Sequence, residues 1–413
     1  MKNYITLKKK ISPFNKKIEV SGDKSISIRS VLLASQAIGK SKITNLLESE
    51  DVLNSLKVVK KLGVNFKKKK SHYEIEGLGI SGFNNNKNTK IYAGNSGTLA
   101  RLILGLLVNT KKKVTITGDK SLSNRDFSRV TEPLKMFGTN IKSKNNKLPV
   151  SISGSEFLRP IEYYEKLGSA QCKSSIMLAA IKTPGTTIIK AKQSRNHTEI
   201  FFKNLGIPIK INRKKNIDII RVTGPSNFKS FEYFVPGDIS SSSFFIVLTL
   251  LASKSEILIK NVNINESRIG IIKILNKMNA NINFLNKRVY KGEKIADIKI
   301  KSCKYLKSIN CPSKYNSAAI DEFLIIFLIA AKAKGTSVFK NLGELNEKES
   351  PRLNIAVNFL RKIGVVVKRS RDNIKIVGNP NLSLNGKFVM KNFMGDHRVC
   401  MMTVVAALSF GGE

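Results

Sequence analysis

The sequence predicts an α/β protein of two domains, each built of three repeats with buried helices inside and sheets outside. An apolar helix recurs about every 70 to 80 residues along the 413-residue chain, which is the signature of internal repetition. Each of the first five such helices is followed by a strand, an amphipathic helix and two more strands. Six units of this kind are too many for one hydrophobic core, so we expect two domains of three units.

The recurring helices are apolar on nearly every side, as is typical of helices buried inside a domain. Each begins at a small, polar or charged residue. The six predicted starts lie at Ser25, Gly97, Ser169, Ser240, Asp321 and His397.

The amphipathic helices end at a repeated stop signal. Glycine or asparagine follows the last apolar residue, where a left-handed C-cap is expected. The five predicted stops are Leu62-Gly63, Phe137-Gly138, Leu205-Gly206, Met278-Asn279 and Ile363-Gly364.

Domain boundaries follow from the position of the units. We expect one domain over residues 21–236 and the other over residues 1–20 plus 237–413, with a first strand at Tyr4–Leu7 belonging to the latter. The helix at His397 is the last element of an incomplete sixth unit. By the repeat arithmetic, roughly one strand and one helix are missing after it, and we expect a longer natural chain.

The composition narrows the class of protein. The net charge of +43 would suit nucleic-acid binding, but the lysines are dispersed, tryptophan is absent, and clustered basic faces with stacking aromatics are not evident. No apolar run reaches the roughly 18 residues of a membrane span, and the basic N-terminus lacks a signal core. Four scattered cysteines without zinc spacing indicate neither a disulfide framework nor a metal site. We expect a cytoplasmic protein that needs no partner chain and acts as a monomer.

The stretch Ser21–Arg29 is the first candidate binding element. It places Lys24 and Ser25 at a helix start and Arg29 one turn inside. Free backbone N–H groups, the positive end of the helix dipole and two cations together suit an anion. Taken alone, ordinary helix capping explains such a start equally well.

The other helix starts repeat this chemistry. Gly97 lies in a small-residue turn followed by Arg101, and Ser169, Ala170 and Gln171 offer a hydroxyl and an amide. Taken alone, a tight turn with a surface arginine explains the first of these equally well, and a serine N-cap explains the second. The glycine–aspartate start before Ser240 suits a hinge with a capping aspartate. If parallel helices bring their starts together, the positive ends of several dipoles meet at one site, which suits substrates rich in phosphate and carboxylate.

Further charged residues lie at the remaining starts. Asp321 heads an apolar helix, where desolvation and nearby cations could tune a base. The starts of the outer helices and of the last inner helix add three arginines, two histidines, a hydroxyl and a Lys-Glu pair. The stretch that contains the Lys-Glu pair is explained equally well by a capping serine within a solvated charge cluster. These residues are Arg125, Ser194, His197, Lys348, Glu349, Arg352, His397 and Arg398.

These motifs, in this order, resemble the 3-phosphoshikimate 1-carboxyvinyltransferase family, also called EPSP synthases. The resemblance runs from about Ile11 to Phe410. It is carried by GDKSIS with Arg29, GNSGT with Arg101, GDKSLSNR, SAQCKS, SRNHTE, VPGDISS, IDEF, KESPR and DHR.

The resemblance implies a two-domain inside-out α/β barrel, in which each domain has three βαβαββ units with buried parallel helices. It implies transfer of the enolpyruvyl group of phosphoenolpyruvate to the 5-hydroxyl of shikimate 3-phosphate by addition and elimination, in chorismate and aromatic amino acid biosynthesis. That chemistry needs an acid–base pair and strong anion binding, without a metal or an organic cofactor.

The resemblance also assigns residues. Asp321 would be the base for the 5-hydroxyl and Glu349 the proton donor to C3 of phosphoenolpyruvate, with Lys24 and His397 in support. The phosphoenolpyruvate set would be Lys24, Gly97, Arg125, Arg352 and Arg398. The 3-phosphoshikimate set would be Lys24, Ser25, Arg29, Ser169, Ala170, Gln171, Ser194, Asp321 and Lys348.

Three positions depart from the family pattern without removing a proposed chemical group. Ile28 stands where His or Asn is usual, Asp126 where Pro is usual, and Pro351 where Asp is usual. The family's C-terminus carries a further lysine for phosphoenolpyruvate, which the expected missing segment would contain.

Three alternatives stay open at this point. The sister transferase acting on UDP-N-acetylglucosamine has the same six-unit fold, but its loop cysteine is absent here, because the first cysteine is Cys172. A nucleic-acid-binding protein would use the net charge, and a catalytically inactive relative could be kept for binding.

Overall fold

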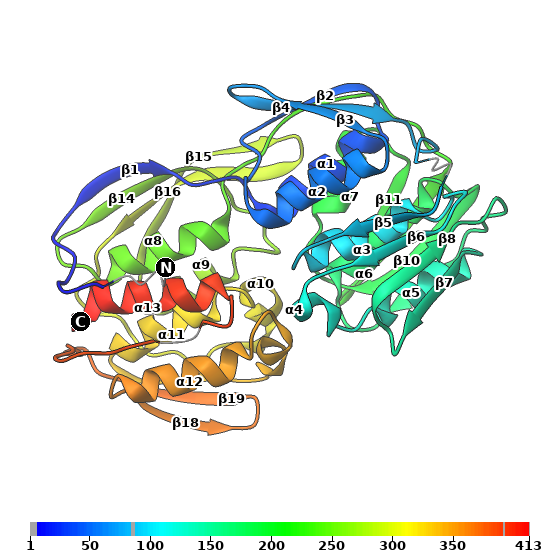
Figure 1. The fold of residues 1–413 in the computed structure, drawn as a ribbon. Coiled ribbons are helices and arrows are strands. Elements are labelled where there is room, and N and C mark those ends of the chain that lie inside the picture. Colours follow the sequence, from blue (N-terminus) through cyan, green and yellow to red (C-terminus); the bar gives the residue numbers. More distant parts are fainter. Residues whose placement is uncertain (1–5, 84–86, 391–392, 413) are drawn as a thin grey trace. The chain divides into compact units, whose positions relative to one another are not determined.

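The computed structural model describes residues 6–83, 87–390 and 393–412 and divides the chain into two compact units (Figure 1). Unit 2 comprises Ser21–Pro236 and Tyr290–Glu293. Unit 1 comprises the chain up to Val20, Gly237–Val289 and the chain from Lys294 onward. Each unit has its own hydrophobic core.

The sequence placed all of residues 237–413 in one domain, so the position of Tyr290–Glu293 is a correction. The Tyr290 ring packs edge-on against Tyr233 with centroids 5.6 Å apart, and its hydroxyl accepts a hydrogen bond from the Phe234 amide at 2.9 Å. Glu293 Oε1 lies 2.6 Å from His197 Nδ1, and both side chains are fully buried. These contacts depend on long-range packing, which a repeat pattern does not encode.

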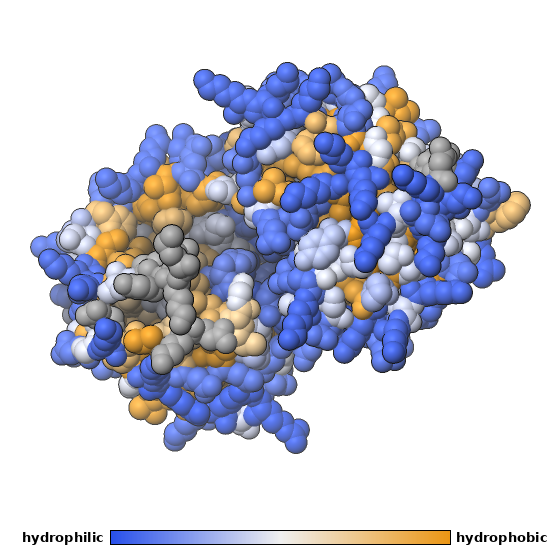
Figure 2. All heavy atoms as spheres, in the orientation of Figure 1, coloured by the Kyte–Doolittle hydropathy of each residue, from blue (hydrophilic) through white to orange (hydrophobic). Residues whose placement is uncertain are grey.

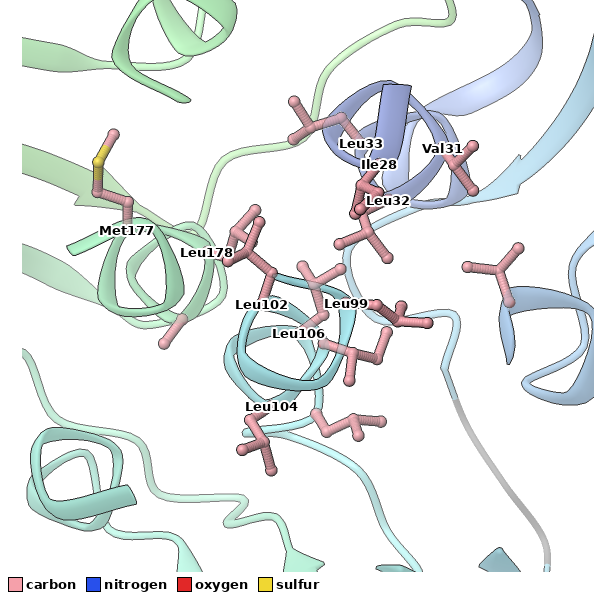
Figure 3. Close-up of a cluster of buried hydrophobic side chains, with 14 of the residues drawn as sticks. Ile28, Val31, Leu32, Leu33, Leu99, Leu102, Leu104, Leu106, Met177 and Leu178 are labelled. Atoms are coloured by element: carbon pink, nitrogen blue, oxygen red, sulfur yellow. The ribbon is translucent and has the colours of Figure 1, made fainter. Parts of the chain in front are cut away.

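Three buried helices form the centre of unit 2: α1 (Lys24–Gln36), α3 (Gly97–Leu106) and α6 (Ala170–Ala180). Figure 3 shows Leu32, Leu99, Leu102 and Leu178 in the space between them. Burial of large apolar side chains stabilises the unit by roughly 1.5–3 kcal/mol for each. The predicted buried inner helices are therefore confirmed.

Side-chain caps define where these helices begin. Asp23 Oδ1 accepts from the Ile26 amide at 2.9 Å, and Ser96 and Ser169 cap α3 and α6 in the same way. A short polar side chain at the N-cap satisfies a backbone N–H that has no partner inside the helix. The other N–H groups of the first turn have no acceptor inside the helix.

Among the described residues, unit 2 also contains four outer helices and twelve strands. The outer helices are α2 (Glu50–Lys61), α4 (Lys120–Ser123), α5 (Ser128–Met136) and α7 (His197–Asn204). The strands are β2 (Ile38–Thr44), β3 (Asn65–Lys68), β4 (His72–Leu78), β5 (Thr89–Tyr92), β6 (Val114–Thr117), β7 (Asn140–Lys144), β8 (Lys147–Ser153), β9 (Glu162–Glu165), β10 (Gly185–Lys192), β11 (Ile209–Arg213), β12 (Ile217–Gly224) and β13 (Glu232–Phe234).

The strands of unit 2 form three sheets of one pattern, with orders β13-β2-β4-β3, β5-β6-β8-β7 and β9-β10-β12-β11. In each sheet the first two strands run parallel and the others antiparallel. In β2, for example, Ile43 pairs with Tyr73 of β4 and with Tyr233 of β13. Because the three sheets repeat one topology, the predicted repeat holds at the level of strand pairing.

Unit 1 repeats the arrangement around α8 (Ile239–Leu251), α11 (Phe323–Lys332) and α13 (His397–Phe410). Its other helices are α9 (Gly270–Lys277), α10 (Asn316–Ala319) and α12 (Arg352–Lys362), with short 3₁₀ turns at Ser313–Tyr315 and Gly343–Glu347. Its strands are β1 (Asn15–Glu19), β14 (Glu256–Asn263), β15 (Asn281–Tyr290), β16 (Glu293–Lys301), β17 (Gly335–Phe339), β18 (Val366–Ser370) and β19 (Asn373–Gly378). The sheets have the orders β1-β14-β16-β15 and β17-β19-β18.

The first strand of unit 1 differs from the prediction. Half of the predicted strand Tyr4–Leu7 lies outside the described residues, and Thr6 and Leu7 are not in a strand. The first described strand is β1, which runs parallel to β14 with Ile18 opposite Ile259. It supplies the parallel edge strand that the other four-stranded sheets also have.

Close packing of α3 against α6 depends on a missing side chain. A Cβ added to Gly105 of α3 would lie 2.1 Å from the Ser175 carbonyl oxygen of α6. Only glycine allows two helix backbones to approach this closely.

Polar side chains cover most of the face seen in Figure 2, with smaller apolar patches between them. Within the described residues, no helix combines the length and the apolar character that crossing a membrane requires.

Candidate active site

Arg29 ties the start of α1 to α6 and α7 in unit 2. Its Nε donates to Thr198 Oγ1 at 2.8 Å and its Nη2 to Ser174 Oγ at 3.0 Å, and these two hydroxyls lie 2.7 Å apart. Burial lowers the pKa of Arg29 to about 10, although Glu199 and Asp23 act in the opposite direction. A buried cation held mainly by neutral hydroxyls keeps most of its charge available to an anionic ligand.

Gly97 lies between two arginines at the start of α3. A Cβ at Gly97 would lie 3.2 Å from Nη1 of both Arg101 and Arg125. Arg125 Nη2 donates to Asn95 Oδ1 at 2.9 Å, which links it to the turn before the helix. The backbone of Gly97 therefore lies beside the guanidinium groups of Arg101 and Arg125.

Arg101 connects the start of α3 to α6. Its Nη1 donates to Gln171 Oε1 at 2.6 Å and its Nη2 to the Asp126 carbonyl at 3.0 Å, while the guanidinium lies 5.1 Å from the centroid of the Phe127 ring. Burial, followed by repulsion from Arg125, lowers its pKa to about 10. Gln171 Nε2 donates in turn to Thr98 Oγ1 at 3.0 Å.

The loop before α6 is fixed by a carboxylate that the sequence did not single out. Glu165, 3% exposed, accepts hydrogen bonds from three consecutive amides: Leu167 at 3.2 Å, Gly168 at 2.6 Å and Ser169 at 2.9 Å. Charge-assisted bonds of this kind are roughly twice as strong as neutral ones. Glu165 thus sets the backbone position of Ser169, Ala170 and Gln171.

The remaining predicted residues of unit 2 lie at the same helix starts. Lys24 begins α1, where its Nζ lies 2.9 Å from Asp51 Oδ2, and Ser25 follows it. Ser194 Oγ is buried and makes no hydrogen bond to the described residues. His197 is instead a buried partner of Glu293 and presents no accessible group.

Arg352 organises the candidate site of unit 1. It is 1% exposed, and its guanidinium reaches three carboxylates: Asp321 Oδ1 at 3.3 Å, Glu349 Oε2 at 2.5 Å and Asp396 Oδ2 at 2.8 Å. Burial alone would lower the pKa of Arg352, but Glu349, Asp396 and Asp321 raise it above its usual value. The two predicted acid–base residues, Asp321 and Glu349, therefore share one guanidinium.

Asp396 holds this cluster to the start of α13. It caps the helix by accepting from the Arg398 amide at 3.0 Å, and its Oδ2 also accepts from Ser350 Oγ at 2.9 Å. Arg398 Nη1 donates to the Asp321 carbonyl at 3.0 Å. The loops before α11, α12 and α13 thus meet at Arg352 and Asp396.

Two predicted residues lie at the edge of this cluster. Lys348 Nζ pairs with Glu344 Oε1 at 2.7 Å, in the turn before α12. His397 is the exposed first residue of α13.

Sequence reasoning missed several polar residues that support the predicted ones. Their shared property is burial with a long-range partner, which a linear pattern does not reveal. A glutamate directly beside Asp321 at the head of an apolar helix was the clearest available signal. These residues are Glu165, Ser174, Thr198, Arg268, Glu322 and Asp396.

The described residues contain no group of three or more His, Cys, Asp or Glu side chains arranged to hold a metal ion.

Comparison with solved structures places this fold among the enolpyruvyl transferases. An EPSP synthase from Acinetobacter baumannii is similar over 98% of this chain and 91% of its own, with a TM-score of 0.86 and 34% identity. The enolpyruvyl transferase NikO from Streptomyces tendae has the same fold, with a TM-score of 0.74 over 98% of this chain and 91% of its own at 13% identity.

Sequence comparison defines the family. The model of EPSP synthase (3-phosphoshikimate 1-carboxyvinyltransferase) matches residues 8–413. The curated 3-phosphoshikimate 1-carboxyvinyltransferase of Zymomonas mobilis is 36% identical over 98% of this chain and 90% of its own length, and that of Ruthia magnifica is 40% identical over 95% and 88%. The chain belongs to the EPSP synthase family, a family of transferases of the shikimate pathway.

Proposed function

We propose that this protein transfers the enolpyruvyl group of phosphoenolpyruvate to the 5-hydroxyl of shikimate 3-phosphate, using the residues assembled at its inner-helix starts. Family membership supports the reaction. The observation that supports the residue roles best is the shared contact of Asp321 and Glu349 with Arg352. An acid and a base on one buried cation suit a reaction that adds and then removes a proton.

The helix starts of unit 2 supply most of the shikimate 3-phosphate set. Arg29, with its hydroxyl partners, provides a cation for the phosphate, and Gln171 and Ser194 provide an amide and a hydroxyl for the ring hydroxyls. The full proposed set is Lys24, Ser25, Arg29, Ser169, Ala170, Gln171, Ser194, Asp321 and Lys348.

Arginines dominate the phosphoenolpyruvate set. Planar guanidinium groups bind carboxylate and phosphate through two parallel hydrogen bonds, which lysine cannot do. Gly97 lets the ligand approach the backbone beside Arg125. The full proposed set is Lys24, Gly97, Arg125, Arg352 and Arg398.

The reaction proceeds by addition and elimination. Asp321 accepts the proton of the 5-hydroxyl while the hydroxyl oxygen bonds to C2 of phosphoenolpyruvate, and Glu349 donates a proton to C3. Glu349 then takes back a proton from C3 as the C2–O bond to phosphate breaks, which restores the double bond, and the proton held by Asp321 leaves with inorganic phosphate. Lys24 and His397 support the charges that develop at the phosphate and carboxylate.

Arg352 couples substrate binding to this chemistry. Its donors are occupied here by Asp321, Glu349 and Asp396. A substrate carboxylate that binds Arg352 competes with Glu349 for the guanidinium. Because an ion pair favours the ionised form of a carboxyl group, release from Arg352 makes Glu349 a better proton donor.

We also propose that the protein acts as a monomer in the cytoplasm and does not bind nucleic acid specifically. Both residue sets come from one chain. All four cysteines are free, as is usual in a reducing compartment. Light scattering of the purified protein tests the monomer, and a molar mass of two or more chains would contradict it.

Phosphate release tests the proposed reaction. With phosphoenolpyruvate and shikimate 3-phosphate together, we expect turnover that neither substrate supports alone. Turnover with UDP-N-acetylglucosamine in place of shikimate 3-phosphate would favour the sister transferase. Calorimetric titration distinguishes an inactive relative, because shikimate 3-phosphate binding without any turnover would indicate a protein kept for binding.

A further inference from the structure

Glu322 is a buried carboxylate at the start of α11 that does not cap its helix. Its backbone carbonyl accepts from the Ile325 and Ile326 amides, so it occupies the N-cap position. Its side chain makes no capping hydrogen bond and is 1% exposed. Glu322 is thus the N-cap residue of α11 by backbone position only, and its side chain makes its contacts elsewhere.

The side chain of Glu322 instead joins a polar network. Oε1 accepts a hydrogen bond from Ser240 Oγ of α8, and Ser240 Oγ accepts one from Arg268 Nη2 at 2.7 Å. Arg268 Nη2 also donates to Asp238 Oδ1 at 3.1 Å. All four side chains are buried, which makes the network costly to leave incomplete.

Arg398 is the functional group that this network touches. Its Nη1 lies 3.8 Å from Glu322 Oε1 and donates to the Asp321 carbonyl at 3.0 Å. Arg398 is therefore held by two adjacent residues, through a backbone oxygen of one and the side chain of the other. Asp321 directs its own carboxylate to Arg352 instead.

We propose that Glu322 is a positioning residue that orients Arg398 for phosphoenolpyruvate, with Ser240 and Arg268 fixing Glu322 in turn. The inference rests on the proposed function, in which Arg398 binds that substrate. Two neighbouring carboxylates thereby have separate tasks: Asp321 faces Arg352, and Glu322 faces Arg398.

Burial and the neighbouring cations act in opposite directions on the pKa of the Glu322 carboxyl group. Burial and the neighbouring Asp321 raise its pKa above the usual range, while Arg398 and Arg268 act in the opposite direction. Its second oxygen, Oε2, is buried and has no hydrogen-bond partner among the described residues. Because Oε2 has no such partner, the contacts that compensate the burial of Glu322 are those at Oε1 with Ser240 and the charges of Arg398 and Arg268.

Steady-state kinetics of Glu322→Gln test the proposal. Glutamine keeps the shape and an oxygen for Ser240 but removes the charge beside Arg398. We expect the KM for phosphoenolpyruvate to rise roughly ten-fold, as loss of one charge-assisted contact implies, with the KM for shikimate 3-phosphate nearly unchanged. Glu256→Gln is the matched control, because its carboxylate pairs with Lys299 and Lys301 on the sheet of unit 1.

A double-mutant cycle separates positioning from structure. In an Arg398→Lys background the planar fork is gone, so Glu322→Gln should have little further effect on the phosphoenolpyruvate KM. An undiminished effect in that background overturns the proposal. So does an unchanged phosphoenolpyruvate KM, or an equal rise in both KM values together with a lower Tm.

A crystal structure of Glu322→Gln gives a result that does not depend on turnover. If the parent protein is inactive, the proposed function fails, but the position of Arg398 still decides this inference. Displacement of Arg398 from the Asp321 carbonyl supports the positioning role. An Arg398 that stays at hydrogen-bond distance overturns it.

Discussion

Lys182 is a buried cation in unit 2 whose contacts are mainly neutral. It is 6% exposed, its Nζ donates to the Ile80 carbonyl and to Asn109 Oδ1, and it lies 5.5 Å from the centroid of the Phe83 ring. Burial lowers its pKa from the usual 10.5 to about 7. Ionisation in the folded protein is thus unfavourable compared with the unfolded chain.

We predict that Lys182 makes the free energy of unfolding rise with pH above about 7. Between pH 7 and 10.5 the unfolded chain binds a proton at this lysine that the folded protein does not, so the folded state gains relative stability as pH rises. The slope is at most about 1.4 kcal/mol per pH unit. Urea unfolding at several pH values measures it.

Lys182→Met isolates this contribution. The free energy of unfolding of the parent minus that of the variant should increase from about pH 7 to about pH 8.5, a range in which few other side chains titrate. Lys135→Met, at an exposed position, is the control. A difference that does not change with pH would contradict the assignment.

Glu165 allows a prediction about substrate binding. Glu165→Gln places an amide N–H₂ against backbone N–H groups, so the loop carrying Ser169 should shift. We expect roughly ten-fold weaker binding of shikimate 3-phosphate, corresponding to ~1.4 kcal/mol. Calorimetric titration measures this, with the exposed Glu162 of the same strand as the matched control (Glu162→Gln). Equal affinities of the two variants would exclude Glu165 as a determinant of the loop.

At the scale of elements, the recurring pattern predicted the inner helices because it depends on local features of the sequence. These features are apolar residues on every side of a helix and a glycine or asparagine stop after the next helix. The inner helices therefore begin within a few residues of the predicted starts, although α11 begins at Phe323, after Glu322. The contacts of Arg352 were not predictable, because they join loops before three helices that are far apart in sequence. His197 shows the same limit: its partner Glu293 is distant in sequence.

Close packing of α3 against α6 leads to a stability prediction. Gly105→Ala should destabilise unit 2 by about 3 kcal/mol, because its Cβ would meet the Ser175 carbonyl. Gly364→Ala is the comparison, since nothing lies within 4 Å of its Cβ and only its positive φ of 82° is strained. We expect about 1 kcal/mol for that change. Denaturant unfolding that gives a smaller loss for Gly105→Ala than for Gly364→Ala would contradict this account of the packing.

At the scale of the whole molecule, the net charge of +43 dominates the long-range electrostatics. Self-repulsion destabilises a compact, highly charged chain, and salt screens it. We predict that raising NaCl from about 20 mM to about 200 mM increases Tm by ~2–4 °C. Potassium chloride should act equally, because screening does not depend on the cation. A Tm that falls or stays constant in both salts would show that repulsion does not limit stability.

The activity of Asp321→Asn and Glu349→Gln tests the central claim most directly. Loss of a general acid or base lowers kcat by roughly 10²–10⁴-fold. We therefore expect the rate of phosphate release to fall at least about 100-fold in both variants. Glu347→Gln, an exposed carboxylate beside the same loop, should keep parental activity. Near-parental turnover of either Asp321→Asn or Glu349→Gln would contradict the assignment of the acid–base pair held by Arg352.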